Sequence, residues 1–140
     1  MNEISQIPEI KVEAFNKLLQ FVDFFQGLDA VVSEEEKRNR LEGDELEEFY
    51  NDLYDTGFLI VFDWKSWLNE NEVYKNLEND IEEYIMKADL IMLRKLMTSY
   101  IRGDRFTEGL FNRVILNGHI TKILIRLRVL MQSKTEQGAD

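Results

Sequence analysis

The segment 102–109 gathers side chains that could bind charged ligands. It holds two guanidiniums, two carboxylates and one large aromatic ring, in Arg102, Arg105, Asp104, Glu108 and Phe106. A guanidinium stays charged, and its forked donors match the geometry of a carboxylate. We expect a structural ion-pair corner between two helices, with Phe106 as an inward anchor and Arg105 at least half buried against a carboxylate. The alternative is a site for an anion or an acidic partner. Catalysis is not indicated, because no nucleophile stands beside a base.

A second group of such residues comes earlier, where Asp63 is followed by Trp64 and Trp67. Asp63 is a natural N-cap, since its carboxylate can accept from free N–H groups in the first turn of a helix. The structural interpretation is a capped helix pinned to the core, and the functional one is an aromatic pocket wall beside an acid. Asp63 is one candidate partner of Arg105. The candidate binding residues are therefore Asp63, Trp64, Trp67, Arg102, Asp104, Arg105 and Glu108.

Motifs for catalysis or cofactor binding are absent from the sequence. No glycine-rich phosphate loop, nucleophile elbow or zinc-binding helix motif occurs. His119 is the only histidine and there is no cysteine, which excludes a thiolate site and a site built from several histidines within one chain. No carboxylates follow the spacing of a calcium loop. We expect no catalytic residues, no cofactor and no metal, while a hydrolase that uses only carboxylates fits the composition as a third reading.

Helices must hold both groups in place. Asp89 predicts the start of a helix that is apolar around most of its circumference and ends at Gly103. Thr107 is expected to cap the following helix, which ends at Gly118. A last helix is then expected from near His119 to about Gln132, with Lys122, Arg126 and Arg128 left outside.

Upstream, hydrophobic periodicity predicts further helices. The pattern gives one helix from Pro8 to Gln26, a helix from about Asp44 to Gly57 and a short helix over 80–87. Ser33 and Glu36 resemble a capping box at the start of a polar run that is either an exposed helix or a loop. The apolar run 58–62 is expected to be a single extended segment without a sheet. A turn is expected within 70–79.

Length and composition support one folded domain. The 140 residues are 44% hydrophobic and 11% aromatic and include one proline, which is long and apolar enough for a core. The sequence predicts an all-α, compact single-domain bundle of about six or seven helices over 1–140, with 1–7 and 133–140 disordered. No apolar stretch reaches membrane-spanning length, and no signal segment or cysteine occurs. We therefore expect no membrane partner and a cytoplasmic location.

Charge is distributed unevenly along the chain. Residues 1–89 carry 8 Lys and Arg against 23 Asp and Glu, and residues 90–140 carry 9 against 4, so formal charges of −15 and +5 give the total of −10. The simplest account is that the two parts pack together and compensate each other. The alternative is a basic face on the last helices that meets an external anionic partner.

Nucleic-acid binding is the second functional reading. Residues 107–130 read as helix, glycine turn and helix, which resembles a helix-turn-helix. The acidic total charge and the largely apolar last helix disfavour it. We therefore expect a non-enzymatic interaction or regulatory module with a protein partner, or a homo-oligomer, and rank nucleic-acid binding through the basic C-terminal helices second.

The residues also resemble a known family. Phe62–Trp67 reads FDW-x-x-W and Arg102–Gly109 reads R-x-x-RF-x-x-G, with Leu93–Met97 between them and Gly118 followed by Ile123–Leu127. Together these elements resemble a family of small, uncharacterised bacterial proteins with a domain of unknown function. The resemblance covers roughly Tyr50 to Leu127. It implies a bacterial cytoplasmic protein and brings no activity with it.

Overall fold

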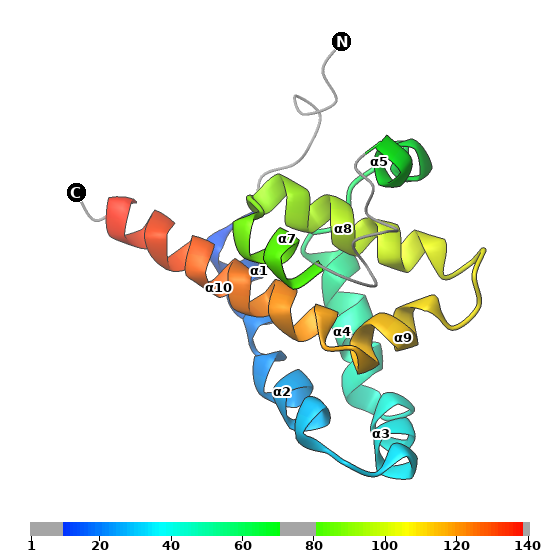
Figure 1. The fold of residues 1–140 in the computed structure, drawn as a ribbon. Helices are drawn as coiled ribbons and strands as arrows, with labels where there is room; N and C mark the ends of the chain where they lie inside the picture. Colours follow the sequence, from blue (N-terminus) through cyan, green and yellow to red (C-terminus); the bar gives the residue numbers. More distant parts are fainter. Residues whose placement is uncertain (1–9, 71–80, 139–140) are drawn as a thin grey trace.

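The structure, a computed structural model, describes residues 10–70 and 81–138. Within these residues the chain forms helices and no strand, which confirms the predicted all-α single-domain fold. The expected disorder of residues 1–7 and most of the turn expected within 70–79 lie outside them. In chain order, the helices shown in Figure 1 are α1 (Val12–Leu19), α2 (Val22–Ala30), α3 (Glu34–Leu41), α4 (Asp44–Asp55), α5 (Trp64–Glu70), α7 (Ile81–Lys87), α8 (Leu90–Gly103), α9 (Leu110–Leu116) and α10 (His119–Gly138).

Helix α10 is the element against which most of the others pack. It contacts α1, α2, α7, α8 and α9, and it crosses the body of the molecule in Figure 1. Its stripe of Ile120, Ile123, Leu124 and Leu127 is almost fully buried, as its apolar spacing predicts. The helix runs past the expected end near Gln132 to Gly138. Because α10 comes from the basic part of the chain and α1, α2 and α7 from the acidic part, the two parts do pack together.

Edge-to-face aromatic contacts join the N-terminal helices to α4. The Phe49 ring lies 5.2 Å from that of Phe21 and 4.9 Å from that of Phe25, between ring centroids. The single helix predicted from Pro8 to Gln26 is wrong, because the chain breaks at Gln20–Phe21 into α1 and α2. No glycine or proline marks the break. The break places Phe21 and Phe25 against Phe49, a contact between distant residues that periodicity does not predict.

The apolar run 58–62 is extended, as predicted, and lies against α8. Phe58 and Ile60 are buried, Leu59 between them is partly buried, and Val61 after them is exposed. This alternation is typical of an extended chain with one covered face. The Ile60 N–H donates to Thr98 Oγ1 on α8 at 3.1 Å. Side chains thus provide hydrogen-bond partners for backbone groups of the segment, in place of a second strand.

A buried arginine holds this segment to α8. Arg94 Nε donates to the Phe58 carbonyl at 3.0 Å, and Nη2 donates to the Gly57 carbonyl at 2.7 Å. Arg94 is only 2% exposed, and burial lowers its pKa, yet a guanidinium stays protonated. The hydrogen bonds therefore bring a charged donor to two backbone acceptors in the interior, where such bonds are strong.

Gly57 makes that arrangement sterically accessible. Its φ of 73° lies in the left-handed region that favours glycine. The Gly57 N–H donates to Tyr54 O, and the Phe58 N–H donates to Leu53 O. This pair of bonds is a Schellman motif and ends α4 at the predicted glycine. The turn presents the carbonyls of Gly57 and Phe58 to Arg94.

Replacing Arg94 with methionine should therefore destabilise the protein while roughly keeping side-chain length. Two buried carbonyl groups lose charged donors, and the expected loss is roughly 2–4 kcal/mol in the free energy of unfolding. Urea unfolding of Arg94→Met and of the matched control Arg105→Met measures this difference. Arg105 is exposed, so the control should lose less than about 0.5 kcal/mol. Equal losses in the two variants would contradict the role given to Arg94.

Candidate functional site

The two groups of residues singled out in the sequence meet where α5 packs against the end of α8. Trp64, the first residue of α5, approaches Gly103, the last residue of α8. A Cβ added to Gly103 would lie 2.9 Å from Leu110 Cδ2 and 3.8 Å from Trp64 Cζ3. Gly103 was expected to end its helix in the left-handed region, but it is a buried helical residue. Because Gly103 has no side chain, α8, α9 and the Trp64 indole can approach one another closely at this position.

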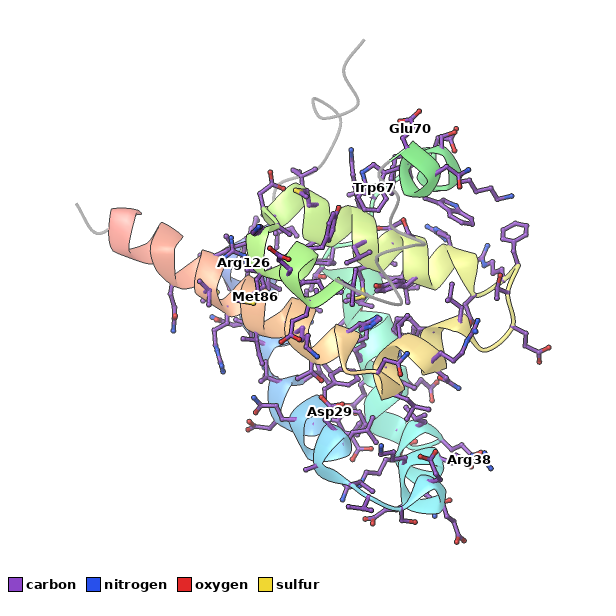
Figure 2. The ribbon with its side chains drawn as sticks, viewed as in Figure 1. Asp29, Arg38, Trp67, Glu70, Met86 and Arg126 are labelled. Carbon is purple, nitrogen blue, oxygen red and sulfur yellow. The ribbon has the colours of Figure 1, made fainter. Side chains whose placement is uncertain are left out.

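Asp63 caps α5, as predicted. Its Oδ1 accepts from the Ser66 N–H at 3.2 Å, and its Oδ2 accepts from the Ser66 hydroxyl at 2.9 Å. These hydrogen bonds lower the pKa of Asp63. The carboxylate is therefore occupied by its own helix and is not a partner of Arg105. Trp67, one turn further along α5, packs its ring edge-to-face on Phe62 with centroids 6.0 Å apart. Figure 2 shows Glu70 at the outer end of α5, away from α8.

The segment 102–109 does not form the predicted ion-pair corner. Arg105 is exposed, and no ion pair involves it among the described residues, so the half-buried pair with a carboxylate is wrong. Phe106 is 69% exposed, so its assignment as an inward anchor is wrong as well. A large apolar side chain usually points inward, but the Phe106 ring lies against Trp64 and Lys65 at the surface.

The charged residues of this segment serve its two flanking helices. Asp104 Oδ1 accepts from the Phe111 N–H at 3.0 Å, so Asp104 caps α9 in place of the predicted Thr107. Gly109, with φ 82°, makes the entry into α9. The Arg102 guanidinium lies over the Tyr54 ring of α4, 5.9 Å from its centroid. Glu108 is exposed.

Asp104 also faces α4. Burial first, and then the negative charge of Asp104, raise the pKa of Tyr50 to about 12. The Tyr50 ring packs on Phe111, with centroids 5.1 Å apart. Arg102 therefore contacts α4, and Asp104 bonds to α9 with its charge near Tyr50, whereas Phe106 lies on the side of α5.

Phe106 stands on the rim of a cleft of about 580 Å³ between α5, the 104–109 turn, α9 and the start of α10. We call it the aromatic cleft and define it by Trp64, Lys65, Phe106, Arg113 and His119. The Trp64 and Phe106 rings lie 5.8 Å apart between centroids at an angle of 43°. Lys65 Nζ lies 4.1 Å from the Phe106 centroid and 5.5 Å from that of Trp64. A cation over an aromatic face is attractive, so the three side chains form one exposed group.

The remaining lining of the aromatic cleft is polar at the edge and apolar inside. Asn69, Thr107 and Asn117 add amide and hydroxyl groups, while Leu110 and Val114 form part of the floor. Among the described residues that line it, the charged side chains are those of Lys65 and Arg113, and none is acidic. The cleft is thus locally cationic on a chain of net charge −10.

His119 forms part of the inner wall. It is 5% exposed and begins α10, as predicted. Its Nδ1 lies 3.5 Å from the Tyr100 hydroxyl of α8, and the two rings stack at 27°. Desolvation by burial, followed by the charge of Lys122, lowers the pKa of His119. The imidazole is therefore neutral near pH 7.

The aromatic cleft contains Trp64 but not Asp63, Trp67, Arg102, Asp104, Arg105 or Glu108 among its lining residues. Lys65, Arg113 and His119 were not singled out by sequence reasoning as site residues. Helical periodicity shows that Arg113 lies opposite the buried Phe111 and Val114, so its exposure could be predicted. The residues of α5 that share the cleft with Arg113 could not be predicted, because α5 and α9 are far apart in sequence.

Three kinds of site find no support in the described part of the chain. No group of three or more histidine and acidic residues there could hold a metal ion. None of the described helices has both the length and the apolar character needed to cross a bilayer. The aromatic cleft offers no nucleophile beside a base, which is what covalent catalysis would need.

Comparison with known proteins assigns a family. A model of a family of unknown function, DUF6508, matches residues 10–133. No curated protein and no solved structure matches the chain. The sequence-based resemblance to a family of unknown function is thereby confirmed, and the match covers α1 to most of α10.

Truncation of Phe106 should have little effect on folding. Because the ring is largely exposed, Phe106→Ala should cost less than about 1 kcal/mol in the free energy of unfolding. Phe111→Ala is the matched control, since Phe111 is 1% exposed and truncating a buried phenylalanine costs roughly 3–5 kcal/mol. Urea unfolding of both variants measures the contrast. A loss of unfolding free energy for Phe106→Ala close to that for Phe111→Ala would mean that Phe106 is buried in the core.

His119 should make folding stability depend on pH. Its pKa is lowered in the folded state relative to the ordinary value near 6.5. The unfolded state therefore binds more protons, and the stability that neutral His119 provides is present above about pH 6.5 and lost as the pH falls below it. Unfolding of the wild type and of His119→Gln between about pH 7.5 and 5 tests this. The wild type should lose more stability on acidification than the variant, and parallel curves would refute the assignment.

Proposed function

This chain belongs to DUF6508, a family of unknown function, and we propose that it is a non-enzymatic interaction module. Its aromatic cleft binds an acidic segment of a partner protein that also carries an aromatic or aliphatic side chain. The apolar side chain lies against Trp64 and Phe106, and the acidic groups meet Lys65 and Arg113. No covalent step is involved.

The exposed ring of Phe106 is the observation that carries this proposal. It is 69% exposed and yet ordered against Trp64 and Lys65. Removing such surface from water is favourable, and the described fold leaves most of it exposed. Tryptophan and arginine are the residue types that contribute most where proteins bind each other. Trp64 and Arg113 lie on opposite sides of the same cleft, which suits an inserted side chain.

Charge specifies the partner. Two cations and no acid line the aromatic cleft, while the first part of the chain is strongly acidic. The rest of the surface therefore repels an acidic segment and the cleft attracts it. This charge pattern favours binding at the cleft over non-specific binding elsewhere on the surface. Exposed Arg105 and exposed Glu108 lie on the same turn as Phe106, and both are outside the lining of the cleft.

Nucleic-acid binding through the last helices has weaker support. Arg126 Nε donates to the Ala88 carbonyl at 2.9 Å, so this guanidinium is anchored between α10 and the end of α7. Figure 2 shows Arg126 beside Met86, on the opposite side of the molecule from α5. Lys122 is partly buried at the start of α10, next to Asp29. Lys122 and Arg126 line one hollow together with Asp29 and Glu82, and these carboxylates weaken the attraction for a phosphate backbone.

Selection from a displayed library of random peptides tests the proposal. Wild-type protein should enrich peptides with acidic residues beside an aromatic or aliphatic one. A synthetic peptide from that selection should bind Lys65→Glu and Phe106→Ala at least about tenfold more weakly, as expected for residues that each contribute above about 1.4 kcal/mol. Its affinity should also fall with added salt.

Arg128→Glu is the matched control for Lys65→Glu. It makes the same charge change at an exposed position on α10, outside the aromatic cleft, and should leave the affinity within about twofold. Equal weakening by both charge reversals would mean that net charge, not the cleft, controls binding. Two results would overturn the proposal. One is enrichment of basic peptides, and the other is a single-stranded oligonucleotide that binds more tightly than the selected peptide and is unaffected by Phe106→Ala.

A further inference from the structure

The inner wall of the aromatic cleft presents one nitrogen atom that has no partner. His119 Nδ1 lies 3.5 Å from the Tyr100 hydroxyl, which is its hydrogen-bond partner among the described residues. In the described residues the only side-chain nitrogen or oxygen atom that is both sealed from solvent and unpaired is the Tyr84 hydroxyl. His119 Nε2 has no hydrogen bond there, so it must retain surface of its own. Because the mostly buried His119 lines the cleft, we infer that this surface of Nε2 faces the cleft.

Tyr100 determines which nitrogen carries the proton. Burial raises the pKa of Tyr100, so its hydroxyl stays protonated, and His119 Nδ1 is its one hydrogen-bond partner among the described residues. If Nδ1 carried the proton, the phenol hydrogen would be left buried without an acceptor, which is unfavourable. With the phenol as donor, Nδ1 accepts and the proton sits on Nε2. The wall then offers a neutral N–H donor at the inner end of the cleft.

From this arrangement, we propose that His119 Nε2–H binds a carboxylate of the ligand at the inner end of the aromatic cleft, and that the bound carboxylate promotes protonation of His119. The ligand class is thereby narrowed to a carboxylate attached, through a short chain, to an aromatic or apolar group. This inference rests on the proposed function and assigns a chemical group to the inner end of the same site. Tyr100 acts as a positioning residue.

The charges around His119 set the direction of the coupling. Lys65 of α5 and Arg113 of α9 line the same cleft, Lys122 follows on α10, and Tyr100 faces His119 from α8. The nearby cations oppose a further positive charge on the imidazole. A bound carboxylate compensates for it and raises the pKa of His119. By linkage, the carboxylate binds more tightly as the pH falls and takes up a proton when it binds.

Two small probes separate the carboxylate from the aromatic group. Phenylpropionate carries both, and phenylpropionamide replaces the charged group with a neutral one of similar shape. His119 is the only histidine in the chain, so its ring ¹⁵N signals are unambiguous in NMR. In free wild-type protein they should report a proton on Nε2. Saturating phenylpropionate should raise the His119 pKa by about one unit, and its affinity should rise several-fold between about pH 7.5 and 5.5.

Phenylpropionamide should change neither the pKa nor the pH dependence. Tyr100→Phe supplies a matched variant that removes one hydroxyl. It should mix the two tautomers and weaken phenylpropionate more than phenylpropionamide. Because the main readout uses wild-type protein, a variant that fails to fold does not decide the result.

These experiments distinguish failure of this inference from failure of the proposed function. If the selected acidic peptides bind at the cleft but the His119 signals ignore both peptide and phenylpropionate, this inference is overturned and the proposed function stands. A free ring protonated on Nδ1, or equal responses to the acid and the amide, overturns it as well. If neither peptides nor phenylpropionate perturb Trp64 and Phe106, both proposals are wrong.

Discussion

The hydrogen bonds from Arg94 to the carbonyls of Gly57 and Phe58 are the constraint on which the rest of the structure depends. They hold an extended segment with no strand partner against α8, and Thr98 accepts the next free N–H. A neutral side chain could not reach both carbonyls with forked donors. The segment leads directly into α5, so the same bonds deliver Trp64 to the end of α8. Without them the aromatic cleft would lose one wall.

Among the described residues, three aspartates act at helix starts, and Asp29 accepts from the Thr121 hydroxyl. Asp63, Asp89 and Asp104 each accept a backbone N–H at the beginning of α5, α8 and α9. Two ion pairs are found among the described residues: Glu36 with Arg40 on α3, and Glu83 with Lys87 on α7. Each joins exposed side chains four residues apart in its own helix. Such pairs contribute little to stability. The acidic and basic parts of the chain therefore meet through apolar packing and through hydrogen bonds such as those from Arg94 and Arg126 to backbone carbonyls. The cations of the aromatic cleft stay available to a ligand.

The cleft also shows why a site can be assembled without a motif. Lys65 and Arg113 are exposed helix residues, and Phe106 is a turn residue. What makes them a site is the approach of α5 to Gly103, where a methyl group would collide with Leu110. The exposed Phe106 ring and the partly buried Trp64 ring then stand beside two cations in a hollow. His119 forms part of its wall and lies 3.5 Å from the Tyr100 hydroxyl.

The sequence by itself determined the all-α class, the N-caps at Asp63 and Asp89, the glycine ends at Gly57 and Gly118, and the extended run after α4. Each follows from local physics: apolar spacing, short acidic side chains before a helix and positive φ at glycine. Only the tertiary structure decided the break before α2, the exposure of Phe106 and Arg105, the burial of Arg94 and the grouping of Lys65, Arg113 and His119. These depend on contacts between residues far apart in the chain. A single sequence records which faces are apolar, but not which face meets which.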